Sequence, residues 1–91
     1  MSCRSVDELA RGEVVTIAGR LRSVVYTPTE TVPTLEAELF DGTGTIGLVW
    51  LGRRRIAGVE PGRRIVASGR VGVHAGRLAI YNPWYELQVG A

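Results

Sequence analysis

Apolar and polar residues alternate along most of the chain, which is the pattern of a strand with one buried face. In the clearest run, Val15, Ile17, Gly19 and Leu21 share one face and the residues between them share the other. The same period of two returns in four later runs, over residues 35–39, 46–50, 65–73 and 78–80. These runs predict five strands, with the ending "YNPWYELQV" following the last one.

Turn signals separate these runs at regular spacing. The segment "DGTG" (Asp41–Gly44) joins the second and third runs, and "HAG" (His74–Gly76) joins the fourth and fifth. Glycine tolerates positive φ in such turns, and the carboxylate of Asp41 can cap the local backbone. Short strands with regularly spaced turns are typical of a small sandwich or barrel.

Two short segments favour helical turns. "SVDE" (Ser5–Glu8) has the spacing of a capping box and predicts a short helix from Val6 to Ala10. "RRRIAGV" favours one helical turn between the third and fourth strands. Neither segment is long enough to form a stable helix without tertiary contacts.

A near-repeat favours a barrel over a sandwich. "VTIAGRL" (Val15–Leu21) and "IVASGRV" (Ile65–Val71) each place a glycine, Gly19 or Gly69, on the inward face of a strand. A glycine there permits a sharp bend, and small barrels need bends so that one strand can serve both halves of the sheet. We therefore predict an all-β, five-stranded OB-fold Greek-key barrel with short helical turns at the N-terminus and between strands 3 and 4.

Length and composition are those of an ordinary globular domain. The 91 residues are 45% hydrophobic and 22% charged, so we expect a single OB-fold domain over 1–91, with 1–12 as an N-terminal cap segment and 13–89 as the barrel. Cys3 is the one cysteine, which excludes an intrachain disulfide and a cysteine-based metal cage. No apolar run approaches the length of a membrane span or of a signal-peptide core, and we expect a cytoplasmic protein.

All 11 basic residues are arginine, although the net charge is only +2. Arginine offers a flat fork for phosphate and can stack on bases, but a GC-rich genome would produce the same bias. The segment "VWLGRRRIAGVEPGRR" (Val49–Arg64) concentrates five arginines: Arg53, Arg54, Arg55, Arg63 and Arg64. Glu60 is the one acidic residue in this segment that offsets their positive charge. The alternatives for them are a phosphate contact and a solvated loop, and we favour the phosphate contact.

Three segments, "DGTGTIGLVW", "VEPGRRIVASGRV" and "RLAIYNPWY", resemble the OB-fold wedge domain of RecG-type junction helicases and related nucleic-acid-binding OB domains. The resemblance covers roughly Glu13–Glu86 and includes the DGTG hairpin, a proline–glycine entry to strand four and a P-x-Y motif after strand five. The chain has no Walker A sequence. The resemblance therefore implies nucleic-acid binding without ATP hydrolysis or unwinding, by a free-standing OB module.

OB domains usually bind nucleic acid across strands two and three, between the loops that follow strands one and four. Here the first loop is "YTPTETVP" (Tyr26–Pro33) and the second is very short, which predicts a shallow, one-sided groove. Trp50 is in phase with the core, and Tyr85 completes the apolar C-terminal pattern. The aromatic side chains that we expect to stack on bases are Tyr26, Phe40, Tyr81 and Trp84. For Tyr81 and Trp84, barrel closure or contact with a partner subunit is an equal alternative.

Charges and apolar residues on the sheet face oppose this interpretation. Glu36 and Glu38 project from strand two, and cross-strand pairs with Arg20 and Arg22 would leave that face nearly neutral. The outward residues of strand three, Gly47, Val49 and Leu51, carry no charge. They favour the alternative function, a protein-interaction or dimerisation module that docks on a repair or translation enzyme.

No enzymatic site can be assembled from the sequence. His74 and Asp41 are predicted turn residues, and Cys3 lies near the N-terminus. We expect a module without catalysis, cofactor, metal or membrane contact. It binds single-stranded or junction DNA or RNA with low sequence specificity, through arginine–phosphate contacts and aromatic stacking.

Overall fold

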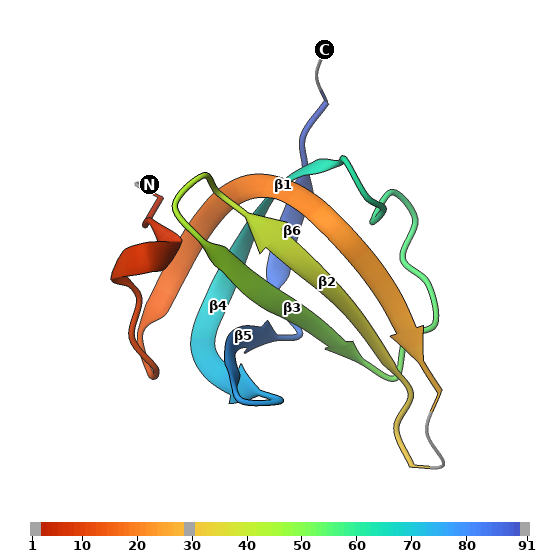
Figure 1. Cartoon of the computed structure of the whole chain (residues 1–91). Coiled ribbons are helices and arrows are strands. Elements are labelled where there is room, and N and C mark those ends of the chain that lie inside the picture. The colour runs from red at the N-terminus through yellow and green to blue at the C-terminus, as the bar shows by residue number, and fades with distance from the viewer. Residues whose placement is uncertain (1–2, 29–30, 90–91) are drawn as a thin grey trace.

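The structure is a computed structural model that describes residues 3–28 and 31–89. It contains a short 3-10 helix, η1 (Val6–Glu8), and six strands (Figure 1). The strands are β1 (Val14–Thr27), β2 (Thr34–Phe40), β3 (Thr45–Leu51), β4 (Arg64–His74), β5 (Arg77–Tyr81) and β6 (Trp84–Leu87). The first five are the five predicted strands, and the chain ending adds β6 as a short further strand.

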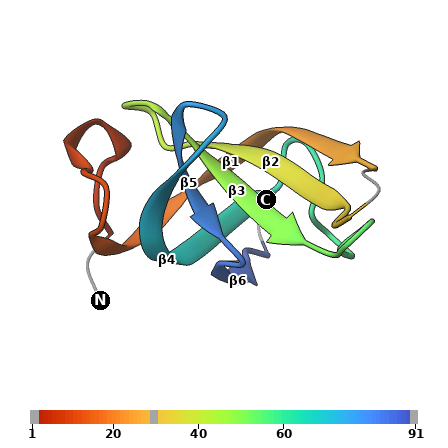
Figure 2. The ribbon, with the colours of Figure 1, turned by 90° about the horizontal axis from the view of Figure 1, so that it is seen from below.

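Five of the strands close into a ring, which confirms the predicted OB-fold barrel. β1 pairs antiparallel with β2 and with β4, β2 pairs with β3, and β4 pairs with β5. A parallel pairing between β3 and β5 closes the ring. β6 pairs only with β4 and lies outside the ring, as the view from below shows (Figure 2).

The bend of β1 at Gly19 lets this strand serve both halves of the barrel. Residues 14–20 pair with β4, and β1 pairs with β2 from Arg20 onward. A Cβ atom on Gly19 would collide with the carbonyl oxygen of Phe40, so glycine is required for β2 to approach β1 here. The inward position predicted for Gly19 is thereby confirmed, and the strand arches over the barrel in Figure 1.

The two copies of the near-repeat are partners across one antiparallel pair. Gly69 lies opposite Val15, and Gly19 lies opposite Ile65, so each glycine faces the first residue of the other copy. A Cβ atom on Gly69 would lie 2.6 Å from Cγ2 of Ile80, which is fully buried. Both glycines therefore keep the barrel interior from being overfilled.

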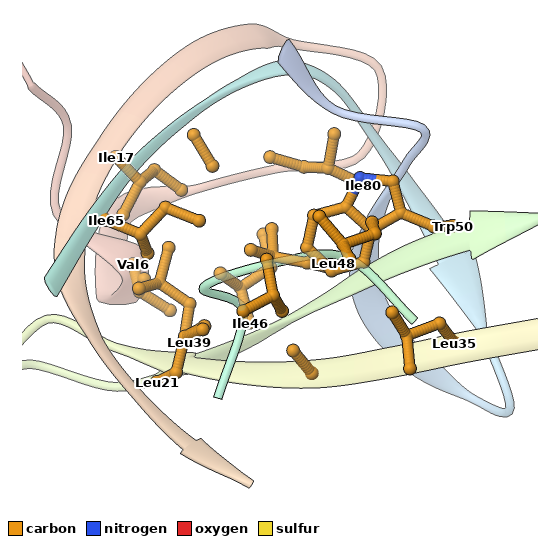
Figure 3. Close-up of a cluster of buried hydrophobic side chains, with 14 of the residues drawn as sticks. Val6, Ile17, Leu21, Leu35, Leu39, Ile46, Leu48, Trp50, Ile65 and Ile80 are labelled. Carbon is orange, nitrogen blue, oxygen red and sulfur yellow. The ribbon is translucent and has the colours of Figure 1, made fainter. Parts of the chain in front are cut away.

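The inward faces of the strands form the core (Figure 3). Trp50 is 4% exposed, which confirms its predicted place in the core, and its ring meets the half-buried Tyr85 edge-on at 5.7 Å between centroids. Ile56 and Val59 add two buried side chains from the loop between β3 and β4. The largest fully buried side chains are Ile17, Leu21, Leu39, Ile46, Leu48, Val49, Ile65, Val71 and Ile80.

The predicted capping box is wrong, and the predicted N-terminal helix is shorter than expected. The side chain of Ser5 makes no capping hydrogen bond, and the helix ends at Glu8. The backbone N–H of Val6 instead donates to Oδ2 of Asp41 at 2.8 Å, while Oδ1 of Asp41 accepts from the N–H of Thr43 and of Gly44 at 2.9 and 3.1 Å. The Asp41 carboxylate thus caps η1, which is distant in sequence, and also the turn after β2 in which Asp41 itself lies.

The segment 52–63, which the structure describes completely, forms turns where we predicted a helical turn. The N–H of Val59 donates to the carbonyl of Ile56 at 3.0 Å, and the N–H of Arg63 donates to that of Glu60 at 3.2 Å. Gly58 and Gly62 have φ of 83° and 90°. This left-handed conformation ends each turn before a helix can continue.

We predict that Gly69→Ala is less stable than Gly72→Ala by at least about 1 kcal/mol. Both changes stiffen the unfolded chain equally, so the comparison isolates the collision with Ile80. At Gly72 the new Cβ atom would meet no atom closer than 3.8 Å. Urea unfolding midpoints of the two variants measure the difference, and equal midpoints would show that the interior at Gly69 has room.

We also predict that Asp41→Asn lowers the free energy of unfolding at pH 7 by about 1 kcal/mol, because a cap is lost. Burial raises the pKa of Asp41, but the hydrogen bonds from Val6, Thr43 and Gly44 outweigh burial and hold this pKa below its ordinary value of 3.8. The stabilisation is therefore present above pH 3.8 and disappears as the pH falls through the lower pKa of the folded state. Urea titrations of both proteins from pH 7 to pH 3 test this, and a difference that does not change with pH would contradict it.

Candidate functional site

The outer face of β2 and β3, which OB domains commonly use for binding, forms an open hollow of about 380 Å³. The end of β1 and the hairpin between β4 and β5 bound it. Across this face, Glu36 of β2, Val49 of β3 and Tyr81 of β5 lie in one row. We call this hollow the groove.

The carboxylates of the groove face basic side chains. Nε2 of His74 lies 3.0 Å from Oε1 of Glu36, and Nδ1 of His74 lies 2.9 Å from the hydroxyl of Tyr81. Arg77 donates from Nη1 to Oε2 of Glu38 at 3.5 Å. The groove thus carries two carboxylates beside one arginine and one histidine, which is no positive track for a polyanion.

The predicted pairs between these carboxylates and Arg20 and Arg22 are wrong. A β-bulge between Leu21 and Ser23 shifts the register, so that Glu38 lies opposite Ser23 and accepts a hydrogen bond from its Oγ at 2.9 Å. The extra residue of the bulge is Arg22. Both arginines therefore lie away from the groove carboxylates, at the end of β2 that carries Phe40.

The predicted exposure of Val49 is also wrong, because this side chain is 1% exposed. Its neighbours across the sheet, Glu36 and Tyr81, are both bonded to His74, whose ring bridges over Val49. Leu51 remains 43% exposed. The apolar strip that favoured protein docking is therefore interrupted.

The five arginines of the 53–64 segment fall into two groups. Arg53, Arg54 and Arg55 are exposed and make no ion pair with any residue that the structure describes. Arg63 is half-buried, and its Nε finds no hydrogen-bond partner within the described chain, whereas Arg64 is exposed at the start of β4. The first group, Arg53–Arg55, is called the arginine loop below.

Backbone hydrogen bonds place the arginine loop beside the end of the β1–β2 hairpin (Figure 1). The N–H of Gly52 donates to the carbonyl of Pro33 at 2.7 Å. At the other end of the loop segment, the N–H of Gly62 donates to the carbonyl of Leu21 at 2.8 Å. The loop segment therefore starts at the β1–β2 connection and returns along β1.

The four predicted stacking aromatics do not share one platform. Tyr26 is 37% exposed and pairs with Leu35, so it lies on the side of the sheet that faces the core. Tyr81 lines the outer face of β5, and its hydroxyl lies 3.1 Å from the carbonyl oxygen of Val73. Trp84 is 60% exposed on β6, outside the ring.

The fourth aromatic, Phe40, belongs to an arginine cluster that sequence reasoning missed. Arg20 lies directly opposite Phe40 on β2 and directly opposite Arg64 on β4. The guanidinium of Arg22 lies 4.5 Å from the centroid of the Phe40 ring. Only the strand register brings these side chains together, and no local motif encodes it.

Within residues 3–28 and 31–89, no group of three or more His, Cys, Asp or Glu side chains is placed to hold a metal ion. Among the same residues, no helix is long and apolar enough to cross a membrane. Cys3 is a free, exposed thiol.

No protein-family model matches the sequence, and no curated protein shows significant sequence similarity to it. Among solved structures, the chain is similar to RecG in the structure of RecG bound to a three-way DNA junction, with a TM-score of 0.77 and 25% sequence identity. The match covers 96% of this chain but only 12% of the RecG chain. It confirms the resemblance to a small part of RecG that the sequence motifs predicted.

Proposed function

We propose that this chain is a non-catalytic nucleic-acid-binding module that contacts single-stranded or junction DNA or RNA through arginine–phosphate contacts and aromatic stacking. The observation that carries the proposal is the arginine loop, where three exposed guanidinium groups have no carboxylate partner among the described residues. The fold likeness to RecG, which was solved bound to a DNA junction, supports it.

Unpaired arginines suit a polyanion for two reasons. Their planar forks match phosphate oxygens in pairs, and they lose no existing ion pair when a phosphate arrives. Each phosphate that they neutralise also releases condensed counterions, which favours binding at low salt. The arginine loop meets both conditions, and the groove, with Glu36 and Glu38 on its floor, meets neither.

Tyr26 is the aromatic best placed to act with the arginine loop. Tyr26 lies opposite Leu35 of β2. The neighbouring residue of β2, Thr34, lies opposite Leu51, and Leu51 is the last residue of β3 before the loop. A base stacked on the exposed ring contributes about 1–3 kcal/mol and needs no particular sequence. A strand held in this way has its phosphates at the arginines and a base at Tyr26.

The contacts of His74 favour a structural role over a catalytic one. Its bonds to Glu36 and Tyr81 hold the β4–β5 hairpin across β2 and β3. The Tyr81 hydroxyl also donates a hydrogen bond to the Val73 carbonyl at 3.1 Å. We assign these three side chains to packing over Val49.

Replacing Arg53, Arg54 and Arg55 together by serine is expected to weaken binding of a labelled single-stranded oligonucleotide by at least about tenfold. The melting midpoint should change little, because exposed loop substitutions shift stability by no more than about 0.5 kcal/mol. Fluorescence anisotropy and thermal melting of the same samples give both values.

The matched control replaces Arg4, Arg11 and Arg70 by serine and removes the same total charge from the other end of β1. There Arg4 is paired with Glu13 at 3.0 Å and Arg70 donates to the carbonyl of Gly12 at 2.7 Å. Equal losses in the two triple variants would show a diffuse positive field. Absence of binding by the natural chain, with a dimer in light scattering, would favour the protein-interaction alternative.

The salt dependence of binding gives a second test. If about three phosphates are contacted, log affinity should fall against log salt with a slope of about −2. The triple-serine variant of the arginine loop should lose most of this slope, whereas the Arg4, Arg11 and Arg70 variant should keep it. An affinity that does not depend on salt would contradict arginine–phosphate binding.

A further inference from the structure

The outer face of β1 and β4 brings two arginines into direct opposition. Arg20 and Arg64 are register partners on antiparallel strands, and both are exposed. Side chains in such a pair start about 5 Å apart at their Cβ atoms, and like charges there are destabilising. Neither guanidinium forms an ion pair with a described residue. The fold therefore keeps two positive charges close together, and an anion bound between the two side chains would reduce their repulsion.

A third guanidinium is held in place beside this pair. Arg22 stacks on Phe40, which is itself opposite Arg20. Stacking on an aromatic face fixes the plane of a guanidinium and leaves its N–H edge free for a phosphate. The β-bulge at Arg22 is thus part of the geometry that gathers three positive charges.

The surface beside Arg20, Phe40 and Arg64 is hollowed, and Arg22 is joined to this hollow through its stacking on Phe40. An open hollow of about 710 Å³ is lined by Arg20, Arg64, Phe40 and the small residues Ala18 and Gly19. The short, outward-facing side chain of Ala18 leaves this hollow open beside Arg20.

Asp41 also lines this hollow, but its oxygens accept hydrogen bonds from Val6, Thr43 and Gly44. Glu86 of β6 is opposite Val66 and accepts a hydrogen bond from Gln88. Neither carboxylate neutralises the arginines through an ion pair in the described chain.

We propose that Arg20, Arg22 and Arg64 form a phosphate-binding site on the outer face of β1 and β4, separate from the groove and from the arginine loop. Its ligand is a backbone phosphate of a second segment of the bound nucleic acid, and this identity rests on the proposed function. In Figure 1, β1 arches over the barrel with β4 behind it, while β2 and β3 lie in front. A branched nucleic acid could place one arm at the arginine loop and another at this outer face.

The test compares Arg20→Gln/Arg64→Gln with the charge-matched Arg4→Gln/Arg70→Gln. Glutamine keeps two of the three methylene groups of arginine and a polar end group, and it removes the positive charge and the guanidinium fork. The probes are a labelled three-way DNA junction, a labelled single strand and inorganic pyrophosphate. Anisotropy measures the two DNA affinities, and thermal melting in pyrophosphate against chloride of equal ionic strength measures anion binding.

We expect the first variant to bind the junction at least about tenfold more weakly than its matched control, and the single strand no more than about threefold more weakly. Pyrophosphate should raise the melting midpoint of the natural chain and of the control variant, and should raise that of the Arg20/Arg64 variant by at most half as much, because Arg53–Arg55 remain there to bind it. Equal junction affinities in the two variants, or equal stabilisation by pyrophosphate, would overturn the site.

Failure of the proposed function has a different signature. In that case the natural chain binds neither DNA, while pyrophosphate still stabilises it through Arg20 and Arg64, and the ligand is a free phosphate compound. If the double variant does not fold, Arg64→Gln alone is the substitute, with an expected loss of pyrophosphate stabilisation of at least half. Full stabilisation of that single variant would overturn the site.

Discussion

The close approach of the Phe40 carbonyl to the α-carbon of Gly19 allows β1 to leave one sheet partner and take another. Before this point β1 is bonded to β4, and after it β1 is bonded to β2. Any side chain at Gly19 would push the end of β2 away and open the ring. The second inward glycine, Gly69, lies opposite Val15, four residues along β1 from Gly19, and leaves room for the buried Ile80. The pairings of the barrel therefore require that these two positions carry no side chain.

The same closure determines where the positive charge lies. Where β1 changes partner, Arg20 belongs to both pairings and thus meets both Phe40 and Arg64. The bulge immediately after it adds Arg22 to the same place. A strand that passed straight through one sheet would have distributed these arginines along an ordinary solvated face. The curvature that completes the barrel also concentrates the charge.

Local patterns were sufficient to predict the first five strands, the OB barrel, the inward glycines and the buried Trp50, because period-two alternation and turn chemistry act within a few residues. Apart from the helical turn that Gly58 and Gly62 prevent, the errors involve partners distant in the chain. The bulge at Arg22 leaves no mark on the alternation, yet it moves Glu36 and Glu38 away from the arginines predicted to pair with them. The cap that Asp41 provides for η1 and the cover of His74 over Val49 join segments that only the fold brings together. Arg20 and Arg64 were visible as single residues, but their opposition required the register between β1 and β4.

The surfaces of this barrel differ in the ion pairs that a phosphate would have to break in order to bind. In the groove a phosphate must compete with Glu36 for His74 and with Glu38 for Arg77, and it approaches two carboxylates as it does so. Unit charges 4 Å apart in water interact by about 1 kcal/mol, so each carboxylate left in place opposes an arriving phosphate by a comparable amount. At the arginine loop and on the outer face of β1 and β4 there is no ion pair to break among the described residues. At the outer face, repulsion between Arg20 and Arg64 is relieved when an anion enters. The arginine loop and the outer face therefore favour a phosphate more than the groove does, because the one arginine and the histidine of the groove are already paired with carboxylates within the fold.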